Sequence, residues 1–159
     1  MRVNRAGEIS AQALYSGQAL FAERSETREQ LERAAAEEID HLVWCTDRLD
    51  QLGGRRSLLD PLWFLGSAAV GMLAGLGGDT VSLGFVAETE AQVEAHLEDH
   101  LSRLPPDDGP SRAILLQMAA DEAHHGTMAR LAGGSAIPAP FRKLMTCGGS
   151  FLRRVAFFL

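Results

Sequence analysis

The sequence predicts an all-α protein in which four long helices pack as one bundle. Apolar residues recur at steps of three and four in four separate stretches, β-branched runs are few, and glycine and proline gather between those stretches. Four amphipathic helices with no strand between them can bury their apolar faces only against one another. A chain of 159 residues with 46% hydrophobic content is enough for a single domain, residues 1–159.

The first two helices are expected over residues 5–23 and 27–52. Ser25 or Thr27 can cap the second of them, and a pair of glycines ends it. Its apolar face is formed by Leu31, Ala35, Glu38, Leu42, Cys45, Leu49 and Leu52.

The next two helices are expected over residues 79–104 and 110–132. The first of them ends at Pro105, because a helix interior does not tolerate proline, and the second ends at Gly133. Both apolar faces include acidic residues: they comprise Leu83, Val86, Glu90, Val93, Leu97 and Leu104 on the first, and Leu115, Met118, Glu122, His125, Ala129 and Ala132 on the second.

Two further segments are strongly apolar. Residues 61–78 form an uncharged crossover segment that is almost long enough to span a bilayer but is rich in glycine. We expect it either to cross the bundle as a buried connection or to face a membrane or line a channel. Residues 138–159 mix arginine and lysine with phenylalanine and leucine, which is typical of an amphipathic helix on a lipid surface. A helix that docks onto the protein is the alternative.

Charge and cysteine content exclude several classes of protein. The net charge is −6 and the pI is near 5.3, with no long basic run, so a nucleic-acid partner is not expected. Cys45 and Cys147 lie far apart, which argues against a disulfide framework and a thiolate zinc site and fits a reducing cytosol. The opening residues resemble neither a secretory signal nor a transit peptide.

Three glutamates lie on predicted apolar faces where the other positions carry mainly apolar side chains: Glu38, Glu90 and Glu122. An ionised carboxylate in an apolar interior costs on the order of several kcal/mol unless a positive charge pairs with it. No lysine or arginine lies beside Glu38 or Glu90 on these faces, whereas His41 and His125 follow Glu38 and Glu122 by one turn. We therefore infer a metal site.

The pattern Glu-x-x-His occurs twice, and its two members share one face of a helix. One such pair is common by chance on exposed helices, but two pairs on apolar faces are specific. Ferritin-like carboxylate bundles combine two such pairs with one glutamate from each of two other helices. The expected ligands are the single acids Glu8 and Glu90 and the paired residues Glu38, His41, Glu122 and His125.

The ligand chemistry predicts a pair of iron ions. Four carboxylates balance the charge of two divalent cations. Oxygen and imidazole ligands without thiolates favour iron or manganese over structural zinc, and iron is the metal that we expect.

Neighbouring polar residues are weaker candidates. Glu37 lies off the apolar face and is expected to be a solvated acid, while Glu94 lies at its edge as a bridging or exposed acid. His124 points about 100 degrees away from its neighbour and is expected at the surface or beside the metals. For His96, an exposed helix face and a place beside the site are equal alternatives. Tyr15 is expected to pack in the core, with contact to the site as the alternative.

Nearly the whole chain is covered by segments of specific sequence: "MRVNRAGEISAQALYSGQAL", "AAAEEIDHLVWCTDRLDQLGGRRSLLDPLWFLGS", "LGFVAETEAQVEAHLEDHLSRLP", "ADEAHHGTMA" and "IPAPFRKLM". These segments resemble the demethoxyubiquinone hydroxylases of bacterial ubiquinone biosynthesis. The resemblance implies a ferritin-like di-iron fold and an O2-dependent monooxygenase that hydroxylates the ring of a demethoxyubiquinol. It assigns the iron to the same six ligands and places His96 near the iron and the ring. Arg5 stands where the family often has a histidine.

The resemblance also implies partners and a location. The substrate would be a prenylated quinol, O2 the co-substrate, and the protein would be peripheral on the cytoplasmic face of the bacterial cell membrane. NADH, the quinol itself or a partner protein could supply electrons, and no dinucleotide-binding fingerprint decides between them. A homo-oligomer and contacts with other proteins of ubiquinone biosynthesis are open alternatives. Members of the family usually begin further upstream, so we expect residues before Met1 in the natural chain.

Two rival functions share parts of this pattern. An iron-storage or ferroxidase bundle would use the same ligands without needing an apolar crossover segment. A non-catalytic membrane-associated scaffold would instead pair its buried acids with arginines such as Arg33 or Arg48.

Overall fold

The computed structural model describes residues 1–159 and is entirely helical. The all-α prediction is confirmed, and the four long helices expected from the sequence are α1, α2, α4 and α5. Both apolar segments are helical as well and form α3 and α6. The helices are α1 (Arg2–Ala19), α2 (Ser25–Gln51), α3 (Asp60–Gly75), α4 (Asp79–Arg103), α5 (Gly109–Leu131) and α6 (Ala139–Phe158).

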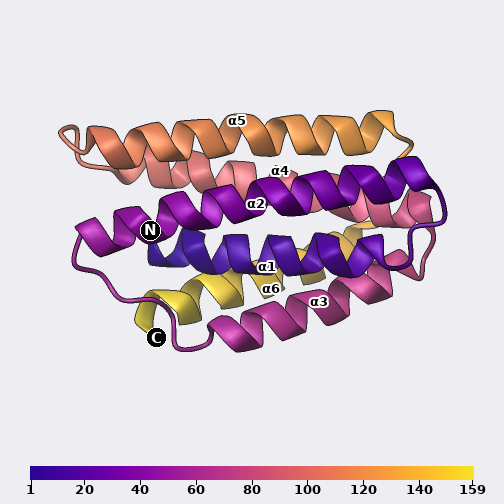
Figure 1. Cartoon of the computed structure of the whole chain (residues 1–159), viewed down its shortest axis with the longest axis horizontal. Coiled ribbons are helices and arrows are strands. Elements are labelled where there is room, and N and C mark those ends of the chain that lie inside the picture. Colours follow the sequence, from indigo (N-terminus) through magenta and orange to yellow (C-terminus); the bar gives the residue numbers. More distant parts are fainter.

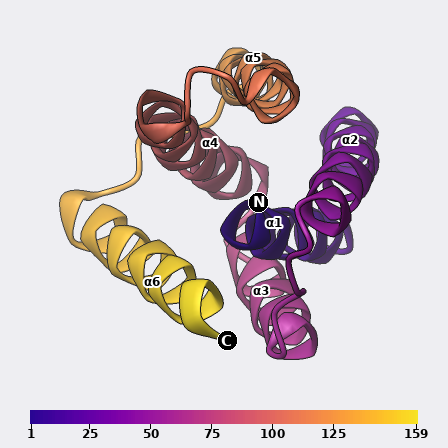
Figure 2. The same ribbon diagram turned by 90° about the vertical axis from the view of Figure 1, so that its left-hand side faces the viewer.

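Two antiparallel helix pairs build the bundle. α1 runs beside α2, and α4 beside α5 (Figure 1). α3 and α6 diverge from each other on the side of α1 and α4 that faces away from α2 and α5 (Figure 2). The largest group of buried apolar side chains lies between α1, α2 and α4 and includes Leu14, Leu31, Leu83 and Val86.

The first helix ends earlier than predicted, at Ala19 rather than at residue 23. Asp79, at the start of α4, accepts hydrogen bonds from the backbone N–H groups of Glu23 (2.9 Å) and Arg24 (3.1 Å). These groups therefore serve the connection to α4 instead of a further helical turn. The apolar pattern continues through Leu20, but this side chain is exposed.

Helix α3 packs along the outside of α1 and does not cross the bundle. The two backbones approach so closely that a Cβ atom added at Gly71 would lie 2.1 Å from the carbonyl oxygen of Leu14, and one at Gly17 would lie 2.5 Å from that of Ala68. Only glycine fits such a crossing. Of the two alternatives for this segment, a buried connection across the bundle is therefore wrong: α3 buries only a narrow face with Trp63, Gly71 and Gly75 and leaves larger side chains such as Leu65 exposed.

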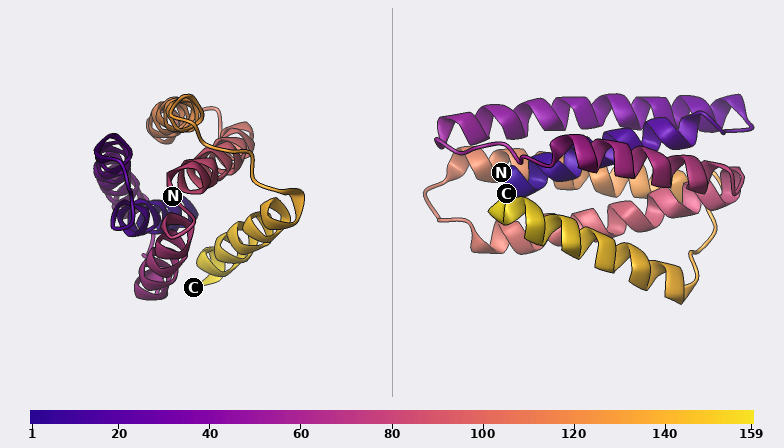
Figure 3. Two further views of the ribbon diagram at one scale, coloured as in Figure 1. Left: turned by 90° about the vertical axis from the view of Figure 1, so that its right-hand side faces the viewer. Right: turned by 90° about the horizontal axis from the view of Figure 1, so that it is seen from below.

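Helix α6, the expected C-terminal amphipathic helix, is attached to the bundle mainly at its C-terminal end. Ala156 is buried in a cluster with Ala6, Ile9 and Trp63, and the N–H of Leu58 donates to the chain's last residue. The N-terminal end of α6 stands away from the bundle (Figure 3). None of the helices combines the length and the apolar character that crossing a bilayer requires.

Candidate dinuclear metal centre

All six predicted ligands come together inside the bundle, each at most 7% exposed. Helix α1 contributes one of them, α2 two, α4 one and α5 two. Their ligand atoms form two groups, and within each group all atoms lie within 4.8 Å of one another. Two glutamates belong to both groups, as expected for two ions bridged by carboxylates. The groups are Glu8, Glu38, His41 and Glu122, and Glu38, Glu90, Glu122 and His125.

These groups contain buried polar atoms that pair with nothing else in the protein. Both oxygens of Glu38, one oxygen each of Glu90 and Glu122, and Nδ1 of both histidines have no hydrogen-bond partner. Nδ1 of His41 lies 3.4 Å from Glu38, and Nδ1 of His125 lies 3.4 Å from Glu122. Buried polar groups are almost always paired, so the unpaired atoms fit a bound cation. The role of the six residues as metal ligands stays a prediction.

Electrostatics point in the same direction. Burial raises the pKa values of Glu8, Glu38 and Glu90 above their ordinary range. Burial alone would lower the pKa of His125, but the carboxylates of Glu122 and Glu90, which lie 3.4 Å and 3.5 Å from its Nδ1, raise it to about 11. The site therefore favours positive charge, and two divalent cations would balance its four carboxylates. Oxygen and nitrogen donors without sulfur suit iron or manganese.

Each histidine also contacts an acid on the opposite helix. Nε2 of His41 on α2 lies 3.1 Å from Asp121 on α5, and Nε2 of His125 on α5 lies 2.8 Å from Glu37 on α2. Such carboxylates fix the orientation and tautomer of a metal-binding imidazole. Glu37 is 52% exposed but is not simply solvated, which corrects the sequence prediction.

Asp121 was missed by the sequence analysis, although a local signal exists. In both helices an acid immediately precedes the glutamate of Glu-x-x-His, as Glu37 precedes Glu38 and Asp121 precedes Glu122. Because the preceding residue points about 100 degrees away from the ligand, it can reach across to the neighbouring helix. A repeated acid-Glu-x-x-His pattern would have identified both residues.

Tyr15 is fully buried, as expected for the core, and its hydroxyl also donates a hydrogen bond to Glu90. Both alternatives considered for this residue therefore hold. Burial, together with the charge of Glu90, raises its pKa well above the ordinary value, so the hydroxyl keeps its proton and remains a donor.

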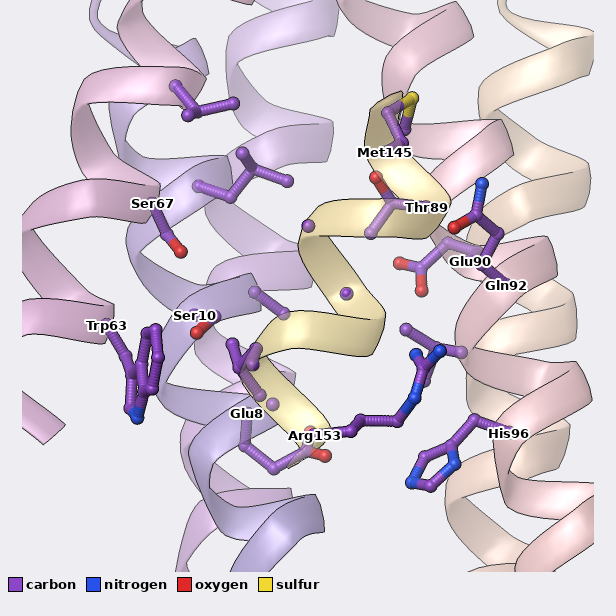
Figure 4. A pocket seen from close by; sticks show the side chains of 18 of the residues that line it. Glu8, Ser10, Trp63, Ser67, Thr89, Glu90, Gln92, His96, Met145 and Arg153 are labelled. Atoms are coloured by element: carbon purple, nitrogen blue, oxygen red, sulfur yellow. The ribbon is translucent and has the colours of Figure 1, made fainter. Parts of the chain in front are cut away.

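An apolar cavity of about 650 Å³ lies between α1, α3, α4 and α6 and reaches the acids. Glu8 lies on one side of it, and Glu90 and His96 lie on the other, on α4 (Figure 4). The rest of the wall is mainly aliphatic, aromatic and glycine. Its members include Leu14, Leu62, Trp63, Val70, Phe85, Val93, Leu144 and Leu152.

His96 lies on the cavity wall rather than on an exposed helix face. Its ring stacks beside that of His100 at 6.1 Å, and Arg153 of α6 lines the same part of the cavity (Figure 4). Burial, with a smaller effect from Arg153, lowers its pKa to about 4. The imidazole is therefore neutral near pH 7.

Other candidates do not join the site. His124 is exposed, and Glu94 is half-buried and belongs to neither group of ligands. Arg5 is buried and pairs with Asp60 at the start of α3, while its Nε donates to Thr46.

The two arginines that a non-catalytic scaffold was expected to pair with the buried acids do not reach them. Arg33 lies 4.0 Å from Glu29 at the surface, and Arg48 pairs with Asp108 at 2.8 Å. The prediction that Arg33 or Arg48 pairs with the buried acids is therefore wrong.

Comparisons with known proteins agree with the resemblance. Residues 1–155 match the family model described as "Ubiquinone biosynthesis protein COQ7". A protein of Cupriavidus pinatubonensis named 3-demethoxyubiquinol 3-hydroxylase is 59% identical over 145 residues, which cover 91% of this chain and 70% of the relative. Proteins of the same name from Ralstonia pickettii (55% identity; 99% and 72% covered) and Nitrosococcus oceani (52% identity; 100% and 74% covered) are also similar. The chain therefore belongs to the COQ7 family of ubiquinone biosynthesis proteins.

Proposed function

We propose that this protein is a monooxygenase that hydroxylates the ring of a demethoxyubiquinol, with two iron ions held by the six buried ligands. One observation carries the proposal: the cluster of acids and histidines suited to two metal ions lies at the inner end of an apolar cavity. The names of the relatives support the same reaction.

The six ligands divide into two sets. Glu38 and Glu122, which belong to both groups of ligand atoms, would hold both ions, while Glu8 and His41 would hold one ion and Glu90 and His125 the other. Bound iron would supply the activation of O2 and the transfer of one oxygen atom to the ring, with electrons from a reductant for which NADH is our candidate. Asp121 and Glu37 orient the imidazoles, and Tyr15 holds Glu90 in place.

The cavity would bind the substrate. Its apolar wall suits an isoprenoid tail and excludes water from the reacting ring. The ring would lie at the inner end, where Glu8, Glu90 and Glu122 line the cavity. The neutral imidazole of His96 has an unpaired Nε2 that can hydrogen-bond to a ring oxygen.

We further propose that the protein is peripheral on the cytoplasmic face of the bacterial cell membrane. Helices α3 and α6 flank the cavity and expose large apolar side chains, and α6 exposes basic side chains beside them. This combination suits a lipid interface from which a prenylated quinol could enter. The exposed apolar residues include Leu62, Leu65, Leu73, Leu76, Phe141, Leu144, Phe151 and Phe157.

The test is single-turnover hydroxylation. Protein loaded with Fe(II) without oxygen is mixed with ¹⁸O2 and a short-tailed demethoxyubiquinol, and mass spectrometry follows incorporation of one labelled oxygen atom. Glu122→Gln should lose one iron and the product, whereas the exposed neighbour control His124→Gln should retain both. Iron oxidation and mineral formation without a hydroxylated product would instead support the iron-storage rival.

A further inference from the structure

Three polar atoms on the cavity wall, outside the cluster of acids and imidazoles just described, are buried and have no hydrogen-bond partner. They are Nδ2 of Asn4, Nε1 of Trp63 and Nε2 of His96. Because buried donors and acceptors in proteins are almost always paired, such atoms mark positions where a ligand can supply the missing partner. Among them, Asn4 has the most defined orientation.

His100 fixes the orientation of the Asn4 amide. Asn4 is 3% exposed, and its Oδ1 lies 3.1 Å from Nδ1 of His100. An amide oxygen only accepts, so Nδ1 of His100 carries the proton in this contact. The amide nitrogen of Asn4 is then left with its two N–H groups unused.

The wall beside Asn4 leaves room for a flat ring. Asn4 and Glu8 are four residues apart on α1, so they share one face and are separated by roughly 6 Å along the helix axis. Gly7 lines the cavity between them, and a Cβ atom there would meet nothing within 4 Å. A ring lying against Gly7 would have one edge toward the acids and another within reach of the amide.

We propose that Asn4 binds a ring oxygen of the quinol through Nδ2, and that His100 is a positioning residue that holds the amide in the required orientation. This inference rests on the proposed function, because it takes the occupant of the cavity to be a quinol. The contact would set which ring carbon faces Glu8 and the metal site. It also gives a role to two polar side chains that lie beside an apolar cavity.

The experiment measures binding of a ubiquinone with a short isoprenoid tail to the oxidised, iron-loaded protein. Trp63 lines the cavity, so quenching of tryptophan fluorescence reports occupancy. Asn4→Ala and the isosteric Asn4→Asp should each lower the affinity roughly tenfold, because each removes the amide donor. Iron content and melting temperature should stay close to those of the wild type. The matched control is Gln12→Ala, an amide on α1 outside the cavity.

A second ligand separates hydrogen bonding from packing. A benzene ring that carries the same tail but no ring oxygens should bind the wild type and Asn4→Ala with equal affinity. His100→Leu should weaken quinone binding, whereas His100→Gln, which keeps an N–H donor, should retain most of it. In turnover, KM should rise more than kcat falls.

Unchanged quinone affinity in both Asn4 variants, an equal loss with the oxygen-free ligand, or loss of iron on replacing Asn4 would each overturn the inference. If the wild-type protein itself bound no quinone, the proposed substrate class would be wrong. That result differs from a failure confined to the variants.

Discussion

The carboxylate of Asp121 on α5 lies 3.1 Å from Nε2 of His41 on α2. Gln117 donates to the same carboxylate at 2.9 Å, so the acid is held in place from its own helix. Removing it leaves the outer nitrogen of His41 without a partner and the ring free to turn. We expect Asp121→Ala to weaken iron binding by about tenfold to a hundredfold, measured by anaerobic Fe(II) titration.

Asp40→Ala is the matched control for this change. Asp40 is an exposed acid on α2 that lies one position before His41, and its side chain makes no hydrogen bond or ion pair. Its loss should leave the iron affinity unchanged. Equal effects of the two substitutions would mean that net charge, and not the contact with His41, controls metal binding.

Glu38 should have opposite effects on stability with and without metal. In the metal-free protein its carboxylate is fully buried and both oxygens lack a partner. Glu38→Gln should therefore raise the free energy of unfolding of the metal-free protein by about 1 kcal/mol. With Fe(II) present the order should reverse, because the variant loses a bridging ligand and with it the stabilisation by bound metal. Urea unfolding with and without Fe(II) measures both values, and the exposed Glu32→Gln should change neither.

The contact between α1 and α3 can be tested with two glycines of one helix. Gly71→Ala would place a Cβ atom 2.1 Å from the backbone oxygen of Leu14, and we expect a loss of about 1–3 kcal/mol in unfolding free energy. At Gly66 nothing lies within 4 Å, so Gly66→Ala should stabilise α3 by about 0.5–1 kcal/mol. Thermal or urea unfolding that gave the same sign for both variants would contradict the close packing of these helices.

Asp79 should contribute stability that depends on pH. Burial alone would raise its pKa, but hydrogen bonds from Arg24 and from the backbone of Glu23 lower it to about 2, from an ordinary 3.8. A lowered folded-state pKa adds stability above the unfolded value, and this stability is lost as the pH falls through the folded one. Wild type should therefore exceed Asp79→Asn by about 1–2 kcal/mol near neutral pH. The difference should shrink between pH 3.8 and 2, and a difference that stays constant over this range would count against the charged contact.

Much of the bundle could be predicted from the sequence because the signals are local. Steps of three and four place Glu38 and His41, and also Glu122 and His125, on the faces that meet in the core. The helix ends at α2, α4 and α5 agree with the prediction to within about two residues, since glycines or prolines mark them.

The remaining features depend on contacts between helices. Helix α3 is apolar on nearly all sides, so its sequence gives no periodic signal. Close approaches to α1, such as that of Gly71 to Leu14, define which of its faces is buried. The early end of α1 results from the distant Asp79. Likewise, the contact of Asp121 with His41 requires α2 and α5 to lie side by side. The pattern within one helix cannot predict which helix lies beside it.

The basic residues of α6 provide the test of membrane attachment. Arg142 and Lys143 are exposed beside Phe141 and Leu144 at the end of α6 that stands away from the bundle (Figure 3). Each basic residue near an anionic surface contributes about 1 kcal/mol, so replacing both by glutamate should reduce binding to anionic vesicles by at least roughly thirtyfold. The charge change is preferable to deleting residues 141–159, because Leu152 and Arg153 also form the cavity wall. The control is Arg33→Glu on α2, which should sediment with vesicles like the wild type. High salt should weaken vesicle binding of the wild type. Vesicle binding that survived the double change would move the membrane contact to the exposed leucines of α3.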